Sequence, residues 1–419
     1  MRLLIVSQYF WPETFCINEL AASLVERGHD VEVLTGIPNY PRGRFFDGYG
    51  WFKRKKHVYL GVKIHRVPLI PRGRGGAFRL ILNYLSFVLF SCLLGPFICR
   101  GHHHDVIFVY EPSPITVGLP ALLLKKLLKI PVIFWVQDLW PESISATKAV
   151  SSPFILRWVE KLVRYIYNGC DHLLVQSKAF CEPIMRMGID GKKIGYFPNC
   201  ADASFKPVDV EVDAEERGLL PKGFCVMFAG NIGVAQDFPT ILAAAERLKA
   251  YSDIHIVVLG EGRMSGWVED EVRRRGLGGT VHLLGKYPSE AMPRFFSLAD
   301  AMLVTLRKDP IFAMTVPAKV QSYLACGRPI IAALDGEGAR ILRESGAGVV
   351  CETEQPEQLA ETVLDMYHKT DEERRCMGMR ARSYCEANYD GGKLLGILED
   401  IMMKLGIVNR LCLVGGPNK

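Results

Sequence analysis

Short apolar runs alternate with longer amphipathic stretches along nearly the whole chain. The runs are rich in β-branched and aromatic residues and are bounded by Gly, Pro, Asn and Asp, which is typical of buried strands. The predicted strands are residues 2–6, 30–36, 105–110, 131–138 and 172–177, followed by 225–230, 255–260, 281–285, 300–306, 329–334 and 348–351. Continuous apolar strands between helices predict parallel sheets with both faces covered.

A polar stretch at about 202–222 separates two such sets of strands. The chain is long enough for two hydrophobic cores, so we predict an α/β fold of two doubly wound, Rossmann-like domains facing a cleft. The predicted domains are residues 1–200 and 201–388, and residues 389–419 are expected to form a helix that packs back on the N-terminal domain.

The most hydrophobic segment is 77–99, "AFRLILNYLSFVLFSCLLGPFIC". It approaches membrane-spanning length, but Arg79, Asn83 and the Gly95-Pro96 pair interrupt it. Such a segment lies in the membrane interface or forms a buried core helix more often than it crosses a bilayer. Nearby arginines and lysines favour docking on an anionic membrane surface over a core helix, although a solvated loop would also account for them. These basic residues are Arg42, Arg44, Lys53, Arg54, Lys55, Lys56, Arg72, Arg74, Arg79 and Arg100.

The net charge of +6 gives no global case for nucleic-acid binding. The 12 cysteines show no CxxC pair, which indicates reduced thiols in a cytosolic protein rather than disulfides or a zinc site. The run "GHHHD" at 101–105 invites a metal site. Adjacent histidines cannot all face one ion, however, and the run precedes a strand, so no metal is expected there.

In open α/β sheets, ligands bind beyond the carboxyl ends of the strands. Two glycine-containing loops occur there in the second domain, at 228–238 and 259–264. Gly230 and Gly233 would let a backbone offer amide N–H groups to phosphate, and Glu261 could hold sugar or ribose hydroxyls. Plain tight turns and an exposed glutamate remain the alternatives.

The stretch 315–329, "TVPAKVQSYLACGRP", predicts a short helix that starts near Pro317 and is capped by Gly327. Lys319 then lies in the first turn, where a cation costs about 0.3–1 kcal/mol unless an anion binds at the same end. A solvated surface lysine is the alternative interpretation.

Carboxylates follow strands in the first domain. Glu13 comes after the first strand, and Asp138 ends "WVQD". Both are candidates for contact with a second substrate, while a helix-capping or turn role is an equally good account of Asp138.

The motifs "LAASLVERGHDVEVLTG", "FPNCADASFKP", "VMFAGNIG", "IVVLGEG", "VHLLGKYPSEAMPRFFSLADAMLV" and "YLACGRPIIAA" together resemble family 4 glycosyltransferases of the GT-B fold over nearly the whole chain. "QDLWPES" and "VPAKVQSYLACGRPIIAALDGEGA" resemble the branch that builds bacterial lipid-linked polysaccharide (O-antigen, lipopolysaccharide and capsule), including N-acetylfucosamine transferases. Two departures stand out. Met314 and Ser322 occupy the positions where most of the family has two glutamates, and 231–237 lacks the usual Arg and Lys. Lys319 is the obvious replacement for the missing positive charge.

The resemblance implies a membrane-associated, retaining transferase that needs no metal or other cofactor. The donor would be a UDP-sugar, and the acceptor a polyprenyl-diphosphate-linked sugar at the cytoplasmic face of the cell membrane. It places the acceptor in domain 1–200 and the nucleotide sugar in domain 201–388. The candidate catalytic residues are Lys319, as the replacement for the missing charge, and Asp138 and Glu13, because of their positions at strand ends. The implied donor-binding residues are Gly230, Asn231, Gly233, Gly260, Glu261, Gly262, Gly285, Lys319 and Glu337.

Two other functions stay open from sequence. GT-B-like nucleotide-sugar 2-epimerases share the two-domain architecture, but would have no use for a membrane-docking segment. A non-catalytic sugar-nucleotide or lipid-binding partner would be consistent with the two missing glutamates.

Overall fold

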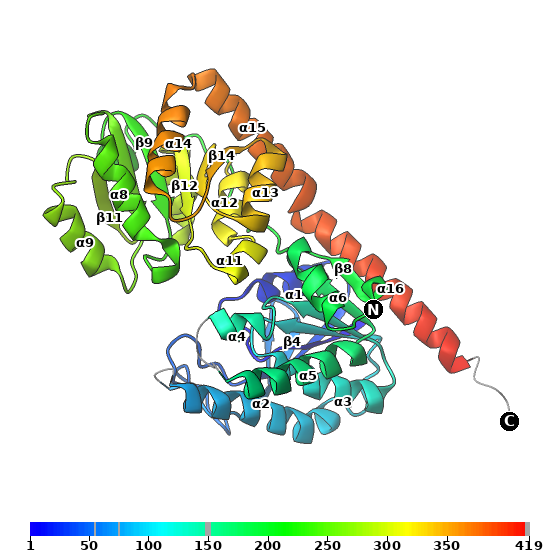
Figure 1. Cartoon of the computed structure of the whole chain (residues 1–419). Helices are drawn as coiled ribbons and strands as arrows, with labels where there is room; N and C mark the ends of the chain where they lie inside the picture. Colours follow the sequence, from blue (N-terminus) through cyan, green and yellow to red (C-terminus); the bar gives the residue numbers. More distant parts are fainter. Residues whose placement is uncertain (54–55, 74–75, 147–151, 415–419) are drawn as a thin grey trace. The chain divides into compact units, whose positions relative to one another are not determined.

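The computed structural model describes residues 1–53, 56–73, 76–146 and 152–414 (Figure 1). Arg54, Lys55 and Arg74 of the predicted basic region lie outside these residues. The chain forms two compact units, Met1–Asn199 with Gly392–Lys419, and Cys200–Gly391. The predicted architecture of two α/β domains with parallel sheets is confirmed.

The first unit contains an eight-stranded sheet in the order β3-β4-β2-β1-β5-β6-β7-β8. Its strands are β1 (Arg2–Val6), β2 (Asp30–Gly36), β3 (Lys56–Tyr59), β4 (Val62–Val67), β5 (Val106–Glu111), β6 (Val132–Val136), β7 (His172–Val175) and β8 (Ile194–Tyr196). Its helices include α1 (Cys16–Glu26), α2 (Ala77–Ile98), α3 (Gly118–Leu128), α4 (Glu142–Ala146), α5 (Pro153–Gly169) and α6 (Cys181–Arg186). The edge strand β3 pairs antiparallel with β4, and the other ladders are parallel.

Helix α16 (Gly391–Val414) lies against this first unit. Glu399 on α16 accepts a hydrogen bond from Arg27 Nη1 at 2.7 Å, and its other oxygen lies 2.9 Å from His29 Nε2. Both partners follow α1, so the C-terminal segment is tied to the turn between α1 and β2.

The second unit contains a six-stranded parallel sheet in the order β11-β10-β9-β12-β13-β14. Its strands are β9 (Phe224–Ala229), β10 (Ile254–Leu259), β11 (Val281–Gly285), β12 (Ala301–Thr305), β13 (Ile330–Ala333) and β14 (Gly348–Cys351). Its helices are α7 (Glu215–Leu219), α8 (Phe238–Leu248), α9 (Ser265–Arg274), α10 (Met292–Leu298), α11 (Pro310–Met314), α12 (Ala318–Ala325), α13 (Gly336–Ser345), α14 (Pro356–His368) and α15 (Asp371–Asn388).

Strand β9 illustrates why these strands read as continuous apolar runs. Val226 and Phe228 pack into one hydrophobic cluster, whereas Met227 and Ala229 pack into another. Successive side chains of a strand point to opposite faces, so helices cover both faces of this sheet.

Three strands of the first unit were not predicted: β3, β4 and β8. Strand β4 carries Lys63 and His65 between its apolar residues, and β3 is a partly exposed edge strand. Their patterns therefore lack the continuous apolar run that marks the central strands.

Among the described residues, α2 is the one helix that is long and apolar enough to cross a membrane. Only 28% of its most apolar 18-residue stretch is buried inside the protein. Its inward face is mixed: Asn83, Ser86 and Ser91 are buried there together with Phe87 and Gly95. Asn83 accepts a hydrogen bond from Gln8 Nε2 at 2.7 Å and donates one to the Ile70 carbonyl at 2.6 Å. The outward face carries exposed Phe78, Ile81, Leu85, Leu89, Leu93 and Phe97. The core-helix alternative is therefore wrong for most of the apolar residues of α2.

Candidate functional site

A cavity of about 1140 Å³ opens in the second unit beside the carboxyl ends of β9, β10 and β11. Its wall includes Gly230 and Asn231 after β9, Gly260, Glu261 and Gly262 after β10, and Gly285 at the end of β11. Six of the predicted donor-binding residues thus lie around one cavity. Gly233, Lys319 and Glu337 are not among the described residues that line it.

Backbone hydrogen bonds join the three loops of this cavity. The Gly230 N–H donates to the Leu259 carbonyl at 2.8 Å, and the Gly260 N–H donates to the Gly285 carbonyl at 2.7 Å. The expectation that Gly230 offers its amide to a phosphate is therefore corrected, because that N–H is already used within the fold.

Gly260 is a glycine for a steric reason. Its φ is +142°, and a Cβ there would lie 1.8 Å from the Gly230 carbonyl oxygen. Only glycine allows this contact between adjacent loops without strain. The sequence analysis expected the loop glycines to let a ligand approach the backbone. At Gly260, the group that approaches is the Gly230 carbonyl of a neighbouring loop.

Lys319 lies in the first turn of α12, as predicted. Pro317 occupies the N-cap position rather than the first helical one, and Gly327 follows the helix with φ +62°. A Cβ on Gly230 would lie 2.8 Å from Lys319 Cε, so the lysine packs directly against a residue of the cavity wall.

The surroundings of Lys319 are neutral. Its Nζ donates a hydrogen bond to Gln236 Oε1 at 2.7 Å and lies 3.4 Å from the centroid of the Phe228 ring. Burial lowers the pKa of Lys319 to about 7. Lys319 is half-buried and its described contacts include no carboxylate, so the alternative of a fully solvated surface lysine is not supported.

Glu337 lies in the first turn of α13 and is buried. Both of its oxygens accept from Arg340, at 2.8 and 2.9 Å. Both oxygens of Glu337, which was predicted to bind the donor, are therefore already used in an ion pair with Arg340. Met314 ends α11 and Ser322 lies in α12, so the two departures from the family pattern lie on the helices on either side of Pro317.

In the first unit, the buried Glu13 carboxylate binds two backbone amides of the loop after β2. Its Oε1 accepts from the amides of Asn39 and Tyr40, at 2.7 and 2.6 Å. Burial raises the pKa of Glu13 to about 7. This geometry fixes the loop after β2, a role that the sequence analysis did not consider.

Asp138 follows β6 and is partly exposed. Burial raises the pKa of its carboxyl to about 6. Helix α4 begins only at Glu142, so Asp138 does not cap that helix and the capping alternative is not supported.

Glu111, at the end of β5, was missed by sequence reasoning. It is fully buried, its Oε2 accepts from the Asp138 amide at 3.4 Å, and its Oε1 is buried without a hydrogen bond. Burial, followed by the nearby charge of Asp138, raises the pKa of Glu111 well above its usual range. An acidic residue closing the apolar run "DVIFVYE" was the available signal.

Aromatic rings gather near these carboxylates in the first unit. The rings of Tyr9 and Phe15 stack at 5.3 Å, and Tyr40 lies 5.8 Å from Tyr9. Arg72 lies over the Tyr40 ring and donates to the Tyr9 hydroxyl at 3.0 Å. The guanidinium is therefore presented beside apolar ring faces, a combination suited to sugars and phosphates.

Two family models match this chain. A glycosyl transferase 4-like domain matches residues 14–200, and a glycosyl transferases group 1 domain matches residues 209–384. The chain belongs to the group 1 glycosyltransferases of the GT-B fold. It is therefore a transferase enzyme, as the resemblance predicted, and a nucleotide sugar is the donor that this family implies.

Known relatives agree with this assignment. The chain is 24% identical over 346 residues to the putative colanic acid biosynthesis glycosyl transferase WcaI of Escherichia coli K12, covering 78% of this chain and 82% of that protein. It superposes with a TM-score of 0.71 on Anabaena Alr3699/HepE in complex with UDP, at 12% identity, over 96% of this chain and all of that one. WaaG, a glycosyltransferase involved in lipopolysaccharide biosynthesis, gives a TM-score of 0.64 at 13% identity, over 96% and 99% of the two chains.

Proposed function

We propose that the protein transfers a sugar, with retention of anomeric configuration, from a UDP-sugar to a polyprenyl-diphosphate-linked sugar. The sugar best supported by the sequence resemblance is an N-acetylated amino sugar. The observation that carries this proposal is the position of Lys319, a half-buried cation with neutral contacts beside the glycine-walled cavity. Such a group is suited to an anionic ligand, and the similar Anabaena protein forms a complex with UDP.

In the proposed reaction, the bond between the sugar C1 and the diphosphate oxygen breaks, and a bond from C1 to the acceptor oxygen forms on the same face. Negative charge grows on the departing diphosphate. Lys319 and the N-terminus of α12 would stabilise it there. The departing phosphate oxygen takes the acceptor proton, so the scheme requires no protein base and no metal.

The acceptor is assigned to the first unit. Asp138 would orient the acceptor hydroxyl, and the buried Glu111 behind it would hold the Asp138 backbone. Arg72, beside the Tyr9 and Tyr40 rings, supplies positive charge for the acceptor diphosphate. Glu13 is reassigned to holding the loop at Asn39–Tyr40, and it supports the ring of Tyr40 indirectly.

A lipid-linked acceptor requires the enzyme to reach a membrane, and we propose peripheral docking on the cytoplasmic face through α2 and α5. The exposed apolar face of α2 supports this, as do exposed Phe154, Ile155 and Trp158 on α5. Helix α3 contacts both helices and exposes Leu127. Arg157, Lys161 and Arg164 are exposed on α5 and suit anionic headgroups. The names of WcaI and WaaG, which refer to colanic acid and lipopolysaccharide, support a role in surface polysaccharide synthesis.

The test is incubation with a panel of UDP-N-acetylhexosamines, with and without a polyprenyl-diphosphate sugar. We expect free UDP and a lipid product longer by one sugar, only when both substrates are present. An epimerised UDP-sugar formed without acceptor would establish the 2-epimerase instead. Tight UDP-sugar binding without either product would establish a non-catalytic partner.

A further inference from the structure

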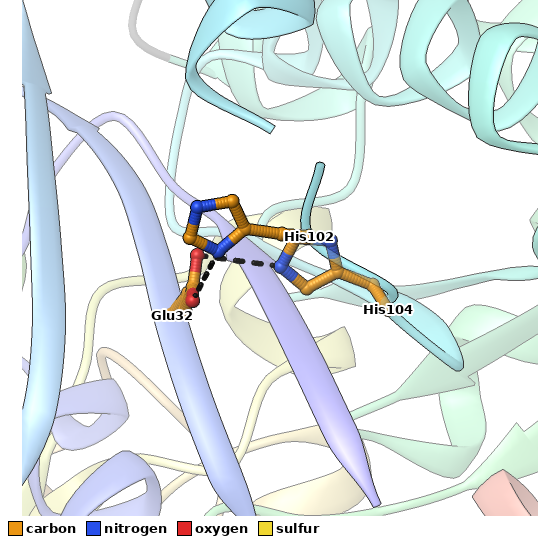
Figure 2. A group of neighbouring side chains, drawn as sticks. All are labelled: Glu32, His102 and His104. Atoms are coloured by element: carbon orange, nitrogen blue, oxygen red, sulfur yellow. Dashed lines mark hydrogen bonds and ion pairs between the residues drawn. The ribbon is translucent and has the colours of Figure 1, made fainter. Parts of the chain in front are cut away.

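A second group of polar side chains lies in the first unit, toward the amino ends of β2 and β5. Asp138 lies at the other end of the sheet, after the carboxyl end of β6. Glu32 comes from the start of β2, His65 from β4, and His102 and His104 from the segment between α2 and β5. Figure 2 shows the rings of His102 and His104 directed toward the Glu32 carboxylate. We refer to these four residues as the Glu32 cluster.

The distances within the Glu32 cluster are short. His102 Nδ1 lies 2.8 Å from Glu32 Oε1, and the Nε2 atoms of His65 and His104 each lie 3.4 Å from Glu32 Oε2. One ligand atom each from Glu32, His102 and His104 lies within 4.8 Å of the other two. Three imidazoles therefore surround one carboxylate.

Most of the Glu32 cluster is withdrawn from water. The side chains of His104, Glu32 and His65 are 2%, 5% and 11% exposed. Both ring nitrogens of His65 and of His104, and Oε2 of Glu32, are buried without a hydrogen bond. Glu32 Oε2 and the Nε2 atoms of His65 and His104 face one another at 3.4 Å, which is ion-pair distance but longer than a normal hydrogen bond. Buried polar atoms are normally hydrogen-bonded, and a cation between these atoms would satisfy them.

The chemistry of these atoms selects the ligand. Imidazole nitrogen and carboxylate oxygen are ligands of Zn²⁺, which takes four of them in a tetrahedron at about 2.0–2.2 Å.

We propose that the Glu32 cluster binds a Zn²⁺ ion through Glu32, His102 Nδ1 and His104 Nε2, while His65 lies against the same carboxylate, with its Nε2 3.4 Å from Glu32 Oε2. The sequence analysis expected no metal at 101–105, because adjacent histidines cannot all face one ion. The fold removes that objection: His102 and His104 are two residues apart, and the third ligand, Glu32, comes from β2.

Charged neighbours affect this site. Lys63 Nζ lies 3.6 Å from Glu32 Oε1 and 2.7 Å from Asp30 Oδ1. Arg2, Asp30 and Lys63 line the adjoining cavity of about 220 Å³. Lys63 therefore competes with the metal for Glu32, and removing its charge should tighten zinc binding.

The zinc would have a structural role. It would join β2 to the segment between α2 and β5, toward the amino ends of these strands, whereas Asp138 follows the carboxyl end of β6. Zinc binding is thus independent of whether the proposed transferase activity is correct.

The full-length protein, treated with a chelator and then dialysed, should be titrated with ZnCl₂ by calorimetry, with melting followed in parallel. Wild-type protein and His103→Ala should bind one Zn²⁺ per chain and melt higher with zinc. His103→Ala is the matched control, because His103 lies in the same run but outside the Glu32 cluster. His102→Ala, His104→Ala and Glu32→Gln should each weaken binding ~10-fold or more, and Lys63→Met should strengthen it.

Substitution with Co²⁺ gives a readout of geometry that does not depend on stability. The visible absorption of a tetrahedral cobalt site should appear in wild type and His103→Ala and be lost in His104→Ala. Absence of Zn²⁺ binding by wild-type protein would overturn the proposal. So would equal binding by the His103→Ala and His104→Ala variants, which would place the metal elsewhere.

Discussion

The ammonium group of Lys319 lies 3.4 Å from the centroid of the Phe228 ring. Phe228 belongs to β9, and Lys319 to the first turn of α12, so one contact joins the strand that leads into the cavity loop to the helix that follows β12. A cation over a ring face is stabilised by only about 0.5–2 kcal/mol. This does not replace a full counter-charge, and the lysine remains available to a diphosphate.

Replacing Lys319 by Ala should reduce sugar transfer ~100- to 1000-fold and weaken UDP binding less severely. The charge on the leaving diphosphate grows toward the transition state, so the lysine contributes more there than in the ground state. Steady-state kinetics and UDP titration measure the two effects. Lys249→Ala is the control, because Lys249 is exposed and bonds to the Arg275 carbonyl. Transfer at the wild-type rate by Lys319→Ala would refute the role of Lys319.

UDP binding should take up a proton at pH 8. The pKa of Lys319 is lowered to about 7 in the free protein, so the side chain is mostly neutral at pH 8, and a bound diphosphate favours the charged form. UDP affinity should therefore fall as pH rises above about 7. Calorimetry in buffers of different ionisation enthalpy measures the uptake. Lys319→Arg, which stays charged, should bind UDP without it, and equal uptake by this variant would assign the proton to another group.

The lowered pKa of Lys319 should also make the free energy of unfolding rise with pH, whereas UDP affinity falls with pH. Between about pH 7 and the unfolded pKa near 10.5, the unfolded chain binds more protons at this lysine than the folded one does. The contribution of Lys319 to the free energy of unfolding should therefore rise with pH across this window. Denaturation of wild type and Lys319→Met at pH 7 and pH 9.5 should show the difference between them change. A constant difference would contradict the low pKa.

Asp138→Asn should lower turnover ~100-fold while leaving UDP affinity unchanged, because in the proposed reaction Asp138 orients the acceptor hydroxyl. The pKa of Asp138 is about 6, and the ionised form accepts the hydroxyl proton in a hydrogen bond. Wild-type activity should therefore decrease as pH falls below about 6. Glu182→Gln, at an exposed ion pair with Arg186, is a control. Full activity of Asp138→Asn would remove the acceptor assignment.

Leu89→Glu should abolish flotation with anionic vesicles at low salt while leaving the melting temperature near that of wild type. Leu89 is 55% exposed on the outward face of α2, so the change disturbs few internal contacts. Val212→Glu is the matched control, since Val212 is 92% exposed in the other unit. Equal recovery of wild type with neutral and anionic vesicles would exclude an electrostatic contribution.

Gly260→Ala should destabilise the second unit by ~2 kcal/mol or more, because its Cβ would collide with the Gly230 carbonyl at a φ of +142°. Gly266→Ala should stabilise by about 0.5–1 kcal/mol, since Gly266 lies within α9 and a Cβ there meets no atom within 4 Å. Chemical denaturation of both variants tests this. Similar effects of the two substitutions would contradict the loop geometry.

The two sheets and the glycine cavity were predictable because their signals are local. The continuous apolar sequence of a strand such as β9 is enough to predict that the strand is buried, and the glycine after it predicts where the loop begins. Lys319 was placed in the right turn because Pro317 and Gly327 flank its helix within a few residues.

Other features depend on partners far away in the chain, and the sequence does not reveal them. Glu337 is the exception, because its partner Arg340 is only three positions away in α13, a spacing that the sequence does show. Glu111 matters because the fold brings it to Asp138, and His102 because the fold brings it to Glu32, which is 70 positions away. A pattern of apolar residues fixes which face of a strand is buried, but not which polar groups from different strands meet.

On α2, the polar side chains of Asn83, Ser86 and Ser91 face the protein, and most apolar side chains face outward. This arrangement also affects the purified protein. Away from lipid, its leucines and phenylalanines are in contact with water, and the same surface on a second molecule can cover them. Self-association of this kind should be reversed by a mild detergent and prevented by Leu89→Glu. An oligomer observed in detergent-free buffer would therefore report on the same surface that we propose docks on a membrane, and need not be a functional assembly.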